Sequence, residues 1–329
     1  MQETRWGVIG PGNIARQFAK DLALLPSPQV VHAVLGHSTD STDQFAKEFN
    51  VPNIYNELDQ FVKDDGIDIV YVATPHTLHY EQVLACLENK LPVLCEKPMV
   101  INREQCEELV NTAKKNSTFL MEGMWLRFLP SIQHLLAIIA EDKIGNIVSI
   151  KATMCYKAPY DPESRYFNPE LGGGSLLDLG IYPVFLTYLL LGKPDTIKAI
   201  GTLSKEKVDL TCSVLFHYKN GQHAVLESSL ATGTDLPAEI SGDKGIIRIL
   251  NPWFEKSAGL EWENFEKEKN IYPTSWDGHG LQFEAQEVLN CLSRNETESK
   301  IIPHQFSLDI MEIMDEIREQ IRLVYEKYE

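Results

Sequence analysis

The first fifteen residues constrain the fold of this chain more than any other segment. A short apolar run, Trp6 to Ile9, ends in the turn Gly10-Pro11-Gly12-Asn13-Ile14-Ala15, and an apolar-periodic segment follows at once. The spacing G-x-G-x-x-A is typical of a strand that turns into a helix beneath the pyrophosphate of a dinucleotide. Gly10 permits the tight turn, Gly12 lets phosphates approach the backbone, and Ala15 lets helix and strand pack closely. An ordinary glycine-rich turn is the alternative, but the placement between a strand and a helix favours dinucleotide binding.

Charge and composition disfavour several classes of partner. The net charge of −17 over 329 residues argues against nucleic acid and anionic membranes. No basic leader with an apolar centre opens the sequence, and the most apolar segment, Ile181 to Leu191, is too short to span a bilayer. Six scattered cysteines form no C-x-x-C pair. We therefore expect a cytoplasmic protein with free thiols, no metal site, and neither a membrane nor a nucleic acid as partner.

The pattern of apolar residues predicts two domains of different class. Strand and helix patterns alternate over the first 120 residues, and continuous apolar runs such as Asp68 to Ala73 indicate a parallel sheet covered on both faces. Beyond them, strands come in series, and Asn220-Gly221 marks a hairpin. The sequence thus predicts an α/β domain with a doubly wound parallel sheet (a Rossmann fold) over residues 1–121. An α+β domain with a large, mainly antiparallel open sheet is predicted over 122–329, and its last helix can pack back on the first domain.

Two further motifs follow buried strands of the first domain. Ala73-Thr74-Pro75-His76-Thr77-Leu78-His79 ends one strand, and Cys95-Glu96-Lys97-Pro98 ends the next. Ligands of open α/β sheets bind beyond the carboxyl ends of the strands, so both loops are suitably placed. Each loop alone is equally typical of a solvated turn, but together with the glycine motif they indicate one site.

These motifs, in this order, resemble the glucose–fructose oxidoreductase/inositol dehydrogenase (Gfo/Idh/MocA) family of nicotinamide-dependent enzymes. Residues 121–130, 172–183 and 314–318 are similar to the branch of dimeric dihydrodiol dehydrogenases and xylose dehydrogenases. The resemblance covers essentially the whole chain and implies a set of residues that bind the cofactor: Gly10, Gly12, Asn13, Ile14, His37, Ser38, Thr74, Pro75, His76, His79, Glu96 and Lys97.

The third cluster carries the expected catalytic residues. Asp178 and Tyr182 are four residues apart, so on a helix they share one face. From the sequence alone, a core tyrosine and a helix-start aspartate remain the alternative. The resemblance implies that Tyr182 is a general acid/base. A phenol has a pKa near 10 and needs a nearby cation to act near neutrality, and Lys97 is the candidate. Asp178 is expected to orient the substrate or Lys97.

Aromatic and basic residues around these motifs are candidates for the substrate pocket. Trp125 and Arg127 follow the strand that leads into the second domain, and Arg165 precedes the glycine run at 172–174. We predict that these three contact the substrate. For Tyr156 and Trp253, a place in the core of the sheet is at least as well supported.

The end of the second strand bears on the choice between NAD and NADP. An NAD site usually places an acid about 20 residues beyond the glycines, where it holds the ribose 2′-hydroxyl. Here the chain reads Leu35-Gly36-His37-Ser38-Thr39, with Asp40 as the nearest acid. Family members that use NADP often have an arginine where His37 stands. Because this turn offers donors and no anion, we predict NADP, with NAD as the alternative.

The leading hypothesis is an NAD(P)-dependent dehydrogenase or reductase. It transfers a hydride between nicotinamide and a hydroxyl-bearing carbon of a sugar, polyol or cyclic diol. A non-catalytic regulatory protein that binds a dinucleotide is the alternative, and an enzyme acting on a linear tetrapyrrole or an anhydrosugar differs only in the pocket. The broad sheet and the resemblance together predict a homodimer or a higher homo-oligomer.

Overall fold

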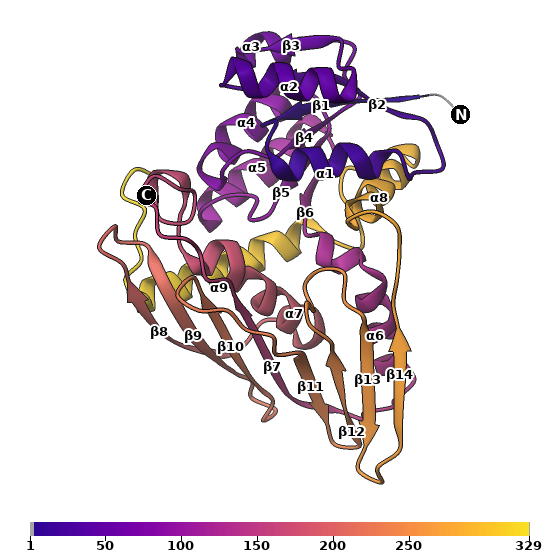
Figure 1. The fold of residues 1–329 in the computed structure, drawn as a ribbon, viewed down its shortest axis with the longest axis vertical. Coiled ribbons are helices and arrows are strands. Elements are labelled where there is room, and N and C mark those ends of the chain that lie inside the picture. Colours follow the sequence, from indigo (N-terminus) through magenta and orange to yellow (C-terminus); the bar gives the residue numbers. More distant parts are fainter. Residues whose placement is uncertain (1–2, 329) are drawn as a thin grey trace. The chain divides into compact units, whose positions relative to one another are not determined.

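The computed structural model describes residues 3–328, which divide into two compact units that each combine two segments of the chain (Figure 1). Unit 1 contains Met1–Trp125 and Asp277–Leu308, and unit 2 contains Leu126–Trp276 and Asp309–Glu329. This grouping differs from the two consecutive segments expected from the sequence, because residues 277–308 join the first unit.

Unit 1 is built on a parallel sheet of six strands. Their order is β3-β2-β1-β4-β5-β6, and each neighbouring pair is parallel. The central strands β4 and β5 are buried at every residue, as expected when helices cover both faces of the sheet. This confirms the predicted doubly wound α/β class. The strands are β1 (Thr4–Ile9), β2 (Gln29–Leu35), β3 (Asn53–Tyr55), β4 (Ile69–Val72), β5 (Val93–Glu96) and β6 (Leu120–Gly123).

The helices of unit 1 follow the predicted pattern closely. Asn102 caps α5, because its side-chain oxygen accepts the Gln105 N–H at 2.9 Å. The sequence did not predict β3 or the one-turn helix α3. The helices are α1 (Asn13–Leu22), α2 (Thr39–Phe49), α3 (Leu58–Phe61), α4 (His76–Glu88), α5 (Arg103–Asn116) and α8 (Leu281–Ser293).

A buried carboxylate explains why α8 belongs to unit 1. Asp21, near the end of α1, is 1% exposed and accepts the backbone N–H groups of His279, Gly280 and Leu281 at 2.9–3.0 Å. These donors lie at the start of α8, where backbone N–H groups lack helical partners. Asp21 therefore caps a helix that lies some 260 residues further along the chain.

Unit 2 is built on a sheet of eight strands in the order β14-β13-β12-β11-β7-β10-β9-β8. Every neighbouring pair is antiparallel except β7 with β10, which confirms the mainly antiparallel sheet. The predicted Asn220-Gly221 turn joins β9 to β10. The strands are β7 (Ile147–Cys155), β8 (Thr196–Leu203), β9 (Asp209–His217), β10 (His223–Ser229), β11 (Ala238–Gly242), β12 (Gly245–Ile249), β13 (Gly259–Asn264) and β14 (Lys269–Pro273).

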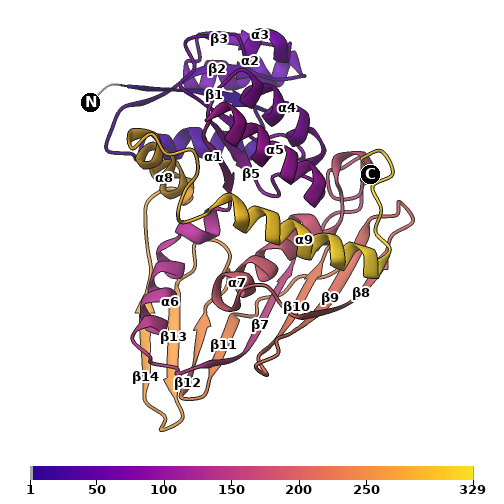
Figure 2. The same ribbon diagram turned by 180° about the vertical axis from the view of Figure 1, so that it is seen from behind.

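The helices of unit 2 lie on one face of this sheet. Seen from behind in Figure 2, α6 (Pro130–Ala140), α7 (Ile181–Leu191) and the second half of α9 (His304–Ile321) lie in front of the strands. Helix α7 contacts β7 and β10, and α6 contacts β12 and β13. Gly201 of β8 leaves room for α9, because a Cβ there would lie 2.9 Å from Ile321. The opposite face carries the exposed side chains of Ile200, Leu215 and Val225.

The apolar segment before β8 is not one uniform helix. It contains a π-helical turn at Leu176–Gly180 and then α7. The helical stretch Pro169–Leu191 is long and apolar enough to cross a membrane, which corrects the shorter span assumed from the sequence. However, 78% of its apolar window is buried inside the protein, so it has the character of a core helix.

Candidate active site

The motifs of unit 1 meet at one edge of the parallel sheet. Gly10 follows β1, His37 lies beyond β2, Thr74 beyond β4, and Lys97 follows β5. Because these strands are parallel, their carboxyl ends lie at the same edge. The strand order reverses between β1 and β4, which is where open α/β sheets bind ligands. The sequence-predicted cofactor residues are thus gathered in one region.

The glycine turn has the properties that a pyrophosphate site needs. Gly10 has a φ of +89°, and a Cβ there would lie 2.7 Å from Thr74 Cγ2 in the neighbouring loop. At Gly12 an added Cβ would meet nothing within 4 Å. Helix α1, which starts at Asn13 and Ile14, has no side-chain cap and no acid in its first turn. Its unpaired N–H groups are therefore left for an anion, and the turn fits a dinucleotide phosphate.

The end of β2 is crowded at one residue and open at the next. A Cβ on Gly36 would lie 2.1 Å from Thr42 Oγ1, so no side chain fits there without a shift. His37 and Ser38 are exposed. Ser38 also caps α2, since its hydroxyl accepts the Ser41 N–H at 3.5 Å. The sequence missed this second role of Ser38.

The loop after β4 is held by its own side chains. Thr74 donates its hydroxyl to Gln82 Oε1 at 2.6 Å, and Pro75 precedes α4, whose first residue, His76, is buried. The hydrogen bond from Thr74 to Gln82 fixes the loop that lies beside the glycine turn.

His79 and Glu96 are turned into the protein. His79 is fully buried, with Nδ1 2.9 Å from the Pro98 carbonyl and Nε2 2.8 Å from the Thr74 carbonyl. Burial lowers the pKa of His79, and the Lys97 charge lowers it further against the effect of the two carbonyls. Glu96 is buried and accepts the Tyr71 hydroxyl. Both side chains therefore support the neighbouring loops, and their contact with the cofactor stays a prediction.

In unit 2 the structure brings Asp178, Tyr182 and Arg165 together. Arg165 Nη2 donates to Asp178 Oδ2 at 2.8 Å, and its guanidinium lies 4.7 Å from the centre of the Tyr166 ring. Asp178 and Tyr182 are 6% and 5% exposed. Burial lowers the pKa of Arg165, but Asp178, Tyr166 and Tyr182 raise it more. Arg165 is therefore a cation close to the Tyr182 phenol, a pairing that the sequence did not predict.

A buried acid holds the start of the segment that carries these residues. Asp209 is fully buried and accepts the Ser175 hydroxyl at 2.6 Å and the Leu176 N–H at 2.8 Å. Burial raises the pKa of Asp209 to about 7. Gly174 has a φ of +122°, and a Cβ there would lie 2.2 Å from Asp209 Oδ1. The sequence analysis missed Asp209, whose signal is a single acid at the start of an alternating strand.

The remaining candidates have different surroundings. Trp253 is fully buried and donates its indole N–H to the Thr153 carbonyl at 2.9 Å, so it belongs to the core of the sheet. Tyr156 is partly exposed beside Tyr166. Trp125 and Arg127 both lie in a short 3₁₀ turn, Trp125–Phe128, and are half-buried.

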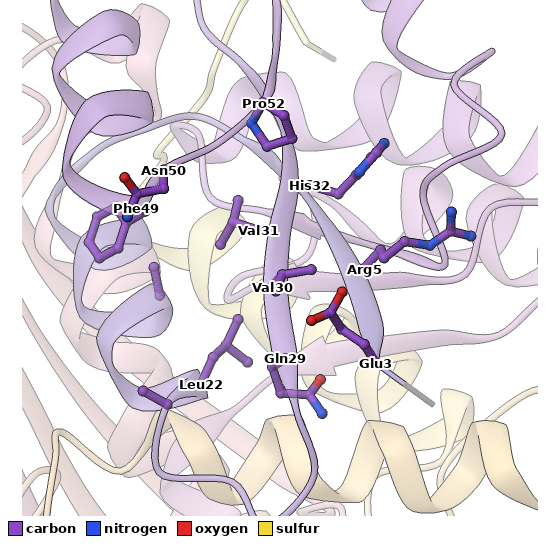
Figure 3. Close-up of a pocket in the computed structure, with 12 residues that line it drawn as sticks. Glu3, Arg5, Leu22, Gln29, Val30, Val31, His32, Phe49, Asn50 and Pro52 are labelled. Carbon is purple, nitrogen blue, oxygen red and sulfur yellow. The ribbon is translucent and has the colours of Figure 1, made fainter. Parts of the chain in front are cut away.

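A separate hollow of about 510 Å³ lies in unit 1 (Figure 3). It is lined by Arg5 and His32 of β1 and β2 and by Phe49 and Asn50 at the end of α2. The cofactor residues predicted from the sequence lie at the opposite, carboxyl edge, so this hollow has no part in the candidate site.

Comparisons with known proteins agree with this arrangement. Residues 4–124 match the family model described as "Oxidoreductase family, NAD-binding Rossmann fold". Residues 132–248 match the Gfo/Idh/MocA C-terminal domain.

Similar proteins span the whole chain. A trans-1,2-dihydrobenzene-1,2-diol dehydrogenase of Xenopus tropicalis is 34% identical, over 98% of this chain and 99% of the relative. Among solved structures, levoglucosan dehydrogenase with NADH and levoglucosan has a TM-score of 0.87 at 18% identity, covering 98% of both chains. A 3-ketoreductase of Actinomadura kijaniata with NADP has a TM-score of 0.86 at 23% identity, covering 97% of this chain and 98% of the other. These two structures show the likeness in fold.

Proposed function

The chain belongs to the Gfo/Idh/MocA family of NAD(P)-binding oxidoreductases, and on that premise we propose which bond it acts on and with which residues. We propose hydride transfer between nicotinamide and a hydroxyl-bearing carbon of a sugar, polyol or cyclic diol. The single observation that carries this is the buried Tyr182 phenol beside the Arg165–Asp178 ion pair. A purely regulatory protein has no need of this arrangement or of Lys97.

The proposed roles divide between the two segments of chain. Residues before about 121 bind the cofactor through Gly10, Gly12 and the loops after β2 and β4, while residues after it bind the substrate. The cofactor, when bound, supplies the hydride acceptor or donor. Tyr182 takes the proton from the substrate hydroxyl during oxidation and returns it during reduction. Cations favour a phenolate over a phenol, so in this proposal Lys97 and Arg165 both stabilise the ionised form of Tyr182.

The substrate class is proposed from the pocket residues and the relatives. Trp125 offers an apolar face for a ring, and Arg127 and Arg165 offer donors to hydroxyl groups. The relatives act, by name, on a dihydrodiol and on levoglucosan. A spectrophotometric screen of aldoses, polyols, inositols and cyclic diols with NAD and NADP tests the proposal. Absence of turnover with every class, at saturating cofactor, would favour the regulatory alternative.

We expect NADP to be used at least as well as NAD. His37 and Ser38 are exposed at the end of β2, where the start of α2 adds backbone N–H donors suited to a 2′-phosphate. His37→Asp should shift the ratio of kcat/KM values towards NAD, because a carboxylate repels the phosphate and accepts a bond from the ribose hydroxyl. Gly36 is unsuitable for this test because it has no room for a Cβ. A wild type that strongly prefers NAD would contradict the prediction.

We also expect a homodimer or larger assembly formed through the open face of the eight-stranded sheet. Ile200 is 80% exposed, and Leu215 and Val225 lie directly opposite each other on β9 and β10. A paired apolar surface of this kind favours association. Sedimentation equilibrium at micromolar concentration should give a multiple of 37.3 kDa. Leu215→Glu should shift the protein to monomer, whereas Phe265→Glu, in an exposed turn elsewhere, should not. A monomeric wild type would contradict this proposal.

A cytoplasmic location is proposed on the cysteines. All six are free, and five of them are buried. Reduced thiols of this kind are usual in a reducing compartment.

A further inference from the structure

Glu122 is a buried acid of unit 1 to which the proposed mechanism gives no role. It lies on β6, is 3% exposed, and is the register partner of Cys95 on β5, two residues before Lys97. One carboxylate oxygen, Oε1, accepts the Met99 N–H at 3.0 Å. The other, Oε2, accepts the Ser307 hydroxyl at 2.6 Å. Both oxygens are therefore held, and one of them holds the turn that contains Lys97.

Two buried side chains bind the backbone of the turn Lys97-Pro98-Met99. His79 of α4 contacts the Pro98 carbonyl, and Glu122 of β6 binds the next N–H group along the chain. Two buried side chains, one from α4 and one from β6, thus hold the carbonyl and the N–H of the peptide bond between Pro98 and Met99. This leaves the backbone beside Lys97 little freedom.

The charges around this turn single out Glu122 as well. Burial raises the pKa of Glu122 overall, while Ser307, Met99 and the Lys97 charge act to lower it. Cys95 also lies against the turn, and burial keeps its thiol neutral by raising its pKa. Both ring nitrogens of His79 face carbonyl oxygens, while burial and the Lys97 charge lower the pKa of the imidazole. Glu96, the remaining acid here, accepts the Tyr71 hydroxyl. An ammonium in such surroundings is stabilised by a fixed negative charge.

We propose that Glu122 is a positioning residue for Lys97, which holds the Lys97-Pro98-Met99 turn and supplies the buried negative charge that keeps the lysine protonated. The inference rests on the proposed function, because Lys97 matters to the reaction only if its charge acts on Tyr182. Glu122 itself touches neither substrate nor cofactor in this proposal.

Glu122→Gln tests the charge with little change in shape. The amide oxygen can still accept the Met99 N–H, and the amide nitrogen can donate to Ser307. The pKa of Lys97 can be read by NMR after reductive ¹³C-methylation of lysines, with its resonance identified by its absence in Lys97→Met. We expect this pKa to fall by about one unit in Glu122→Gln. At a pH above the lowered pKa of Lys97, turnover should fall about tenfold, while NADPH affinity stays unchanged. Glu122→Asp should restore most of the pKa of Lys97 and most of the turnover.

A matched control is available in the same unit. Glu284 is a fully buried carboxyl of α8 whose charged neighbours are Glu96 and Asp21. Glu284→Gln removes an equally buried carboxyl and should leave the pKa of Lys97 unchanged. An unchanged value in Glu122→Gln, or an equal fall in both variants, would overturn the proposal.

Two further outcomes keep the test decisive. If Glu122→Gln fails to fold, Ser307→Ala retains the charge but removes a donor, which raises the pKa of Glu122. The acidic inflection that Glu122 causes in the Lys97 resonance should then move to higher pH, and an inflection that stays in place would overturn the inference. Wild-type turnover in Lys97→Met would contradict the role of Lys97 in the proposed function. The NMR measurement tests the effect of Glu122 on the pKa of Lys97 independently of turnover.

Discussion

Replacing Tyr182 by phenylalanine is expected to lower turnover by about two to four orders of magnitude, the usual loss when a general acid/base is removed. The substitution keeps the buried ring, which lies 6.0 Å from that of Phe254, and removes only the hydroxyl. Folding and cofactor affinity should therefore change little. Single-turnover kinetics on the substrate found by screening, together with NADPH titration by fluorescence, measure the two quantities separately.

Lys97→Met should reduce the same rate by a different route. Loss of a positive charge raises the pKa of Tyr182, so the rise of the oxidation rate with pH should move to higher pH. The double variant should lose less than the sum of the two effects, because the residues act as a unit. Near-wild-type turnover in Tyr182→Phe would show that another group moves the proton. Asp178 and His76 would then be tested, since both ring nitrogens of His79 already face carbonyl oxygens.

Gly12→Val is expected to abolish dinucleotide binding while the fold survives. The backbone at Gly12 has a φ of −80°, which valine adopts readily, and an added Cβ meets nothing within 4 Å. The new side chain would instead occupy the space above the start of α1, where the phosphates are expected. NADPH titration by fluorescence and thermal unfolding by circular dichroism measure the two effects.

A second glycine provides the control for this variant. A Cβ on Gly233 of unit 2 also meets nothing within 4 Å, so Gly233→Val makes the same change in open space in the other unit. It should bind NADPH as the wild type does. Unchanged affinity in Gly12→Val would remove the basis for placing the pyrophosphate at this turn.

The fold classes of both halves could be predicted because long apolar patterns report burial directly. The buried run at β4 and the alternation in β9 each predicted their sheet type. Strand β3 has only three residues, which is too short for either period to stand out. The placement of α8 depends on one carboxylate, Asp21, that binds residues some 260 positions away. No local pattern contains that information.

The site divides along the same line between local and distant contacts. Motifs at strand ends predicted that Gly10, Thr74 and Lys97 would share one edge of the sheet, since parallel topology alone brings them there. The direction in which a side chain points is not encoded in the motif, so the sequence did not predict that both ring nitrogens of His79 face backbone carbonyls. Asp209 and Glu122 escaped notice because an acid among apolar residues reveals its role only through the donors that the fold brings to it.

The discontinuous build of unit 1 bears on how the protein is made. The chain crosses between the units after Trp125, after Trp276 and after Leu308. While a ribosome is still extending the chain, the first 125 residues lack α8, and the Asp21 carboxylate has not yet met the N–H groups that it will bind. The face of α1 that α8 covers also lacks its partner, so the nascent segment can only become fully stable late in synthesis. The nucleotide-binding unit can therefore be completed only after the chain up to Trp276 has been translated. A complete first unit is thus made only in a chain that already contains most of the second.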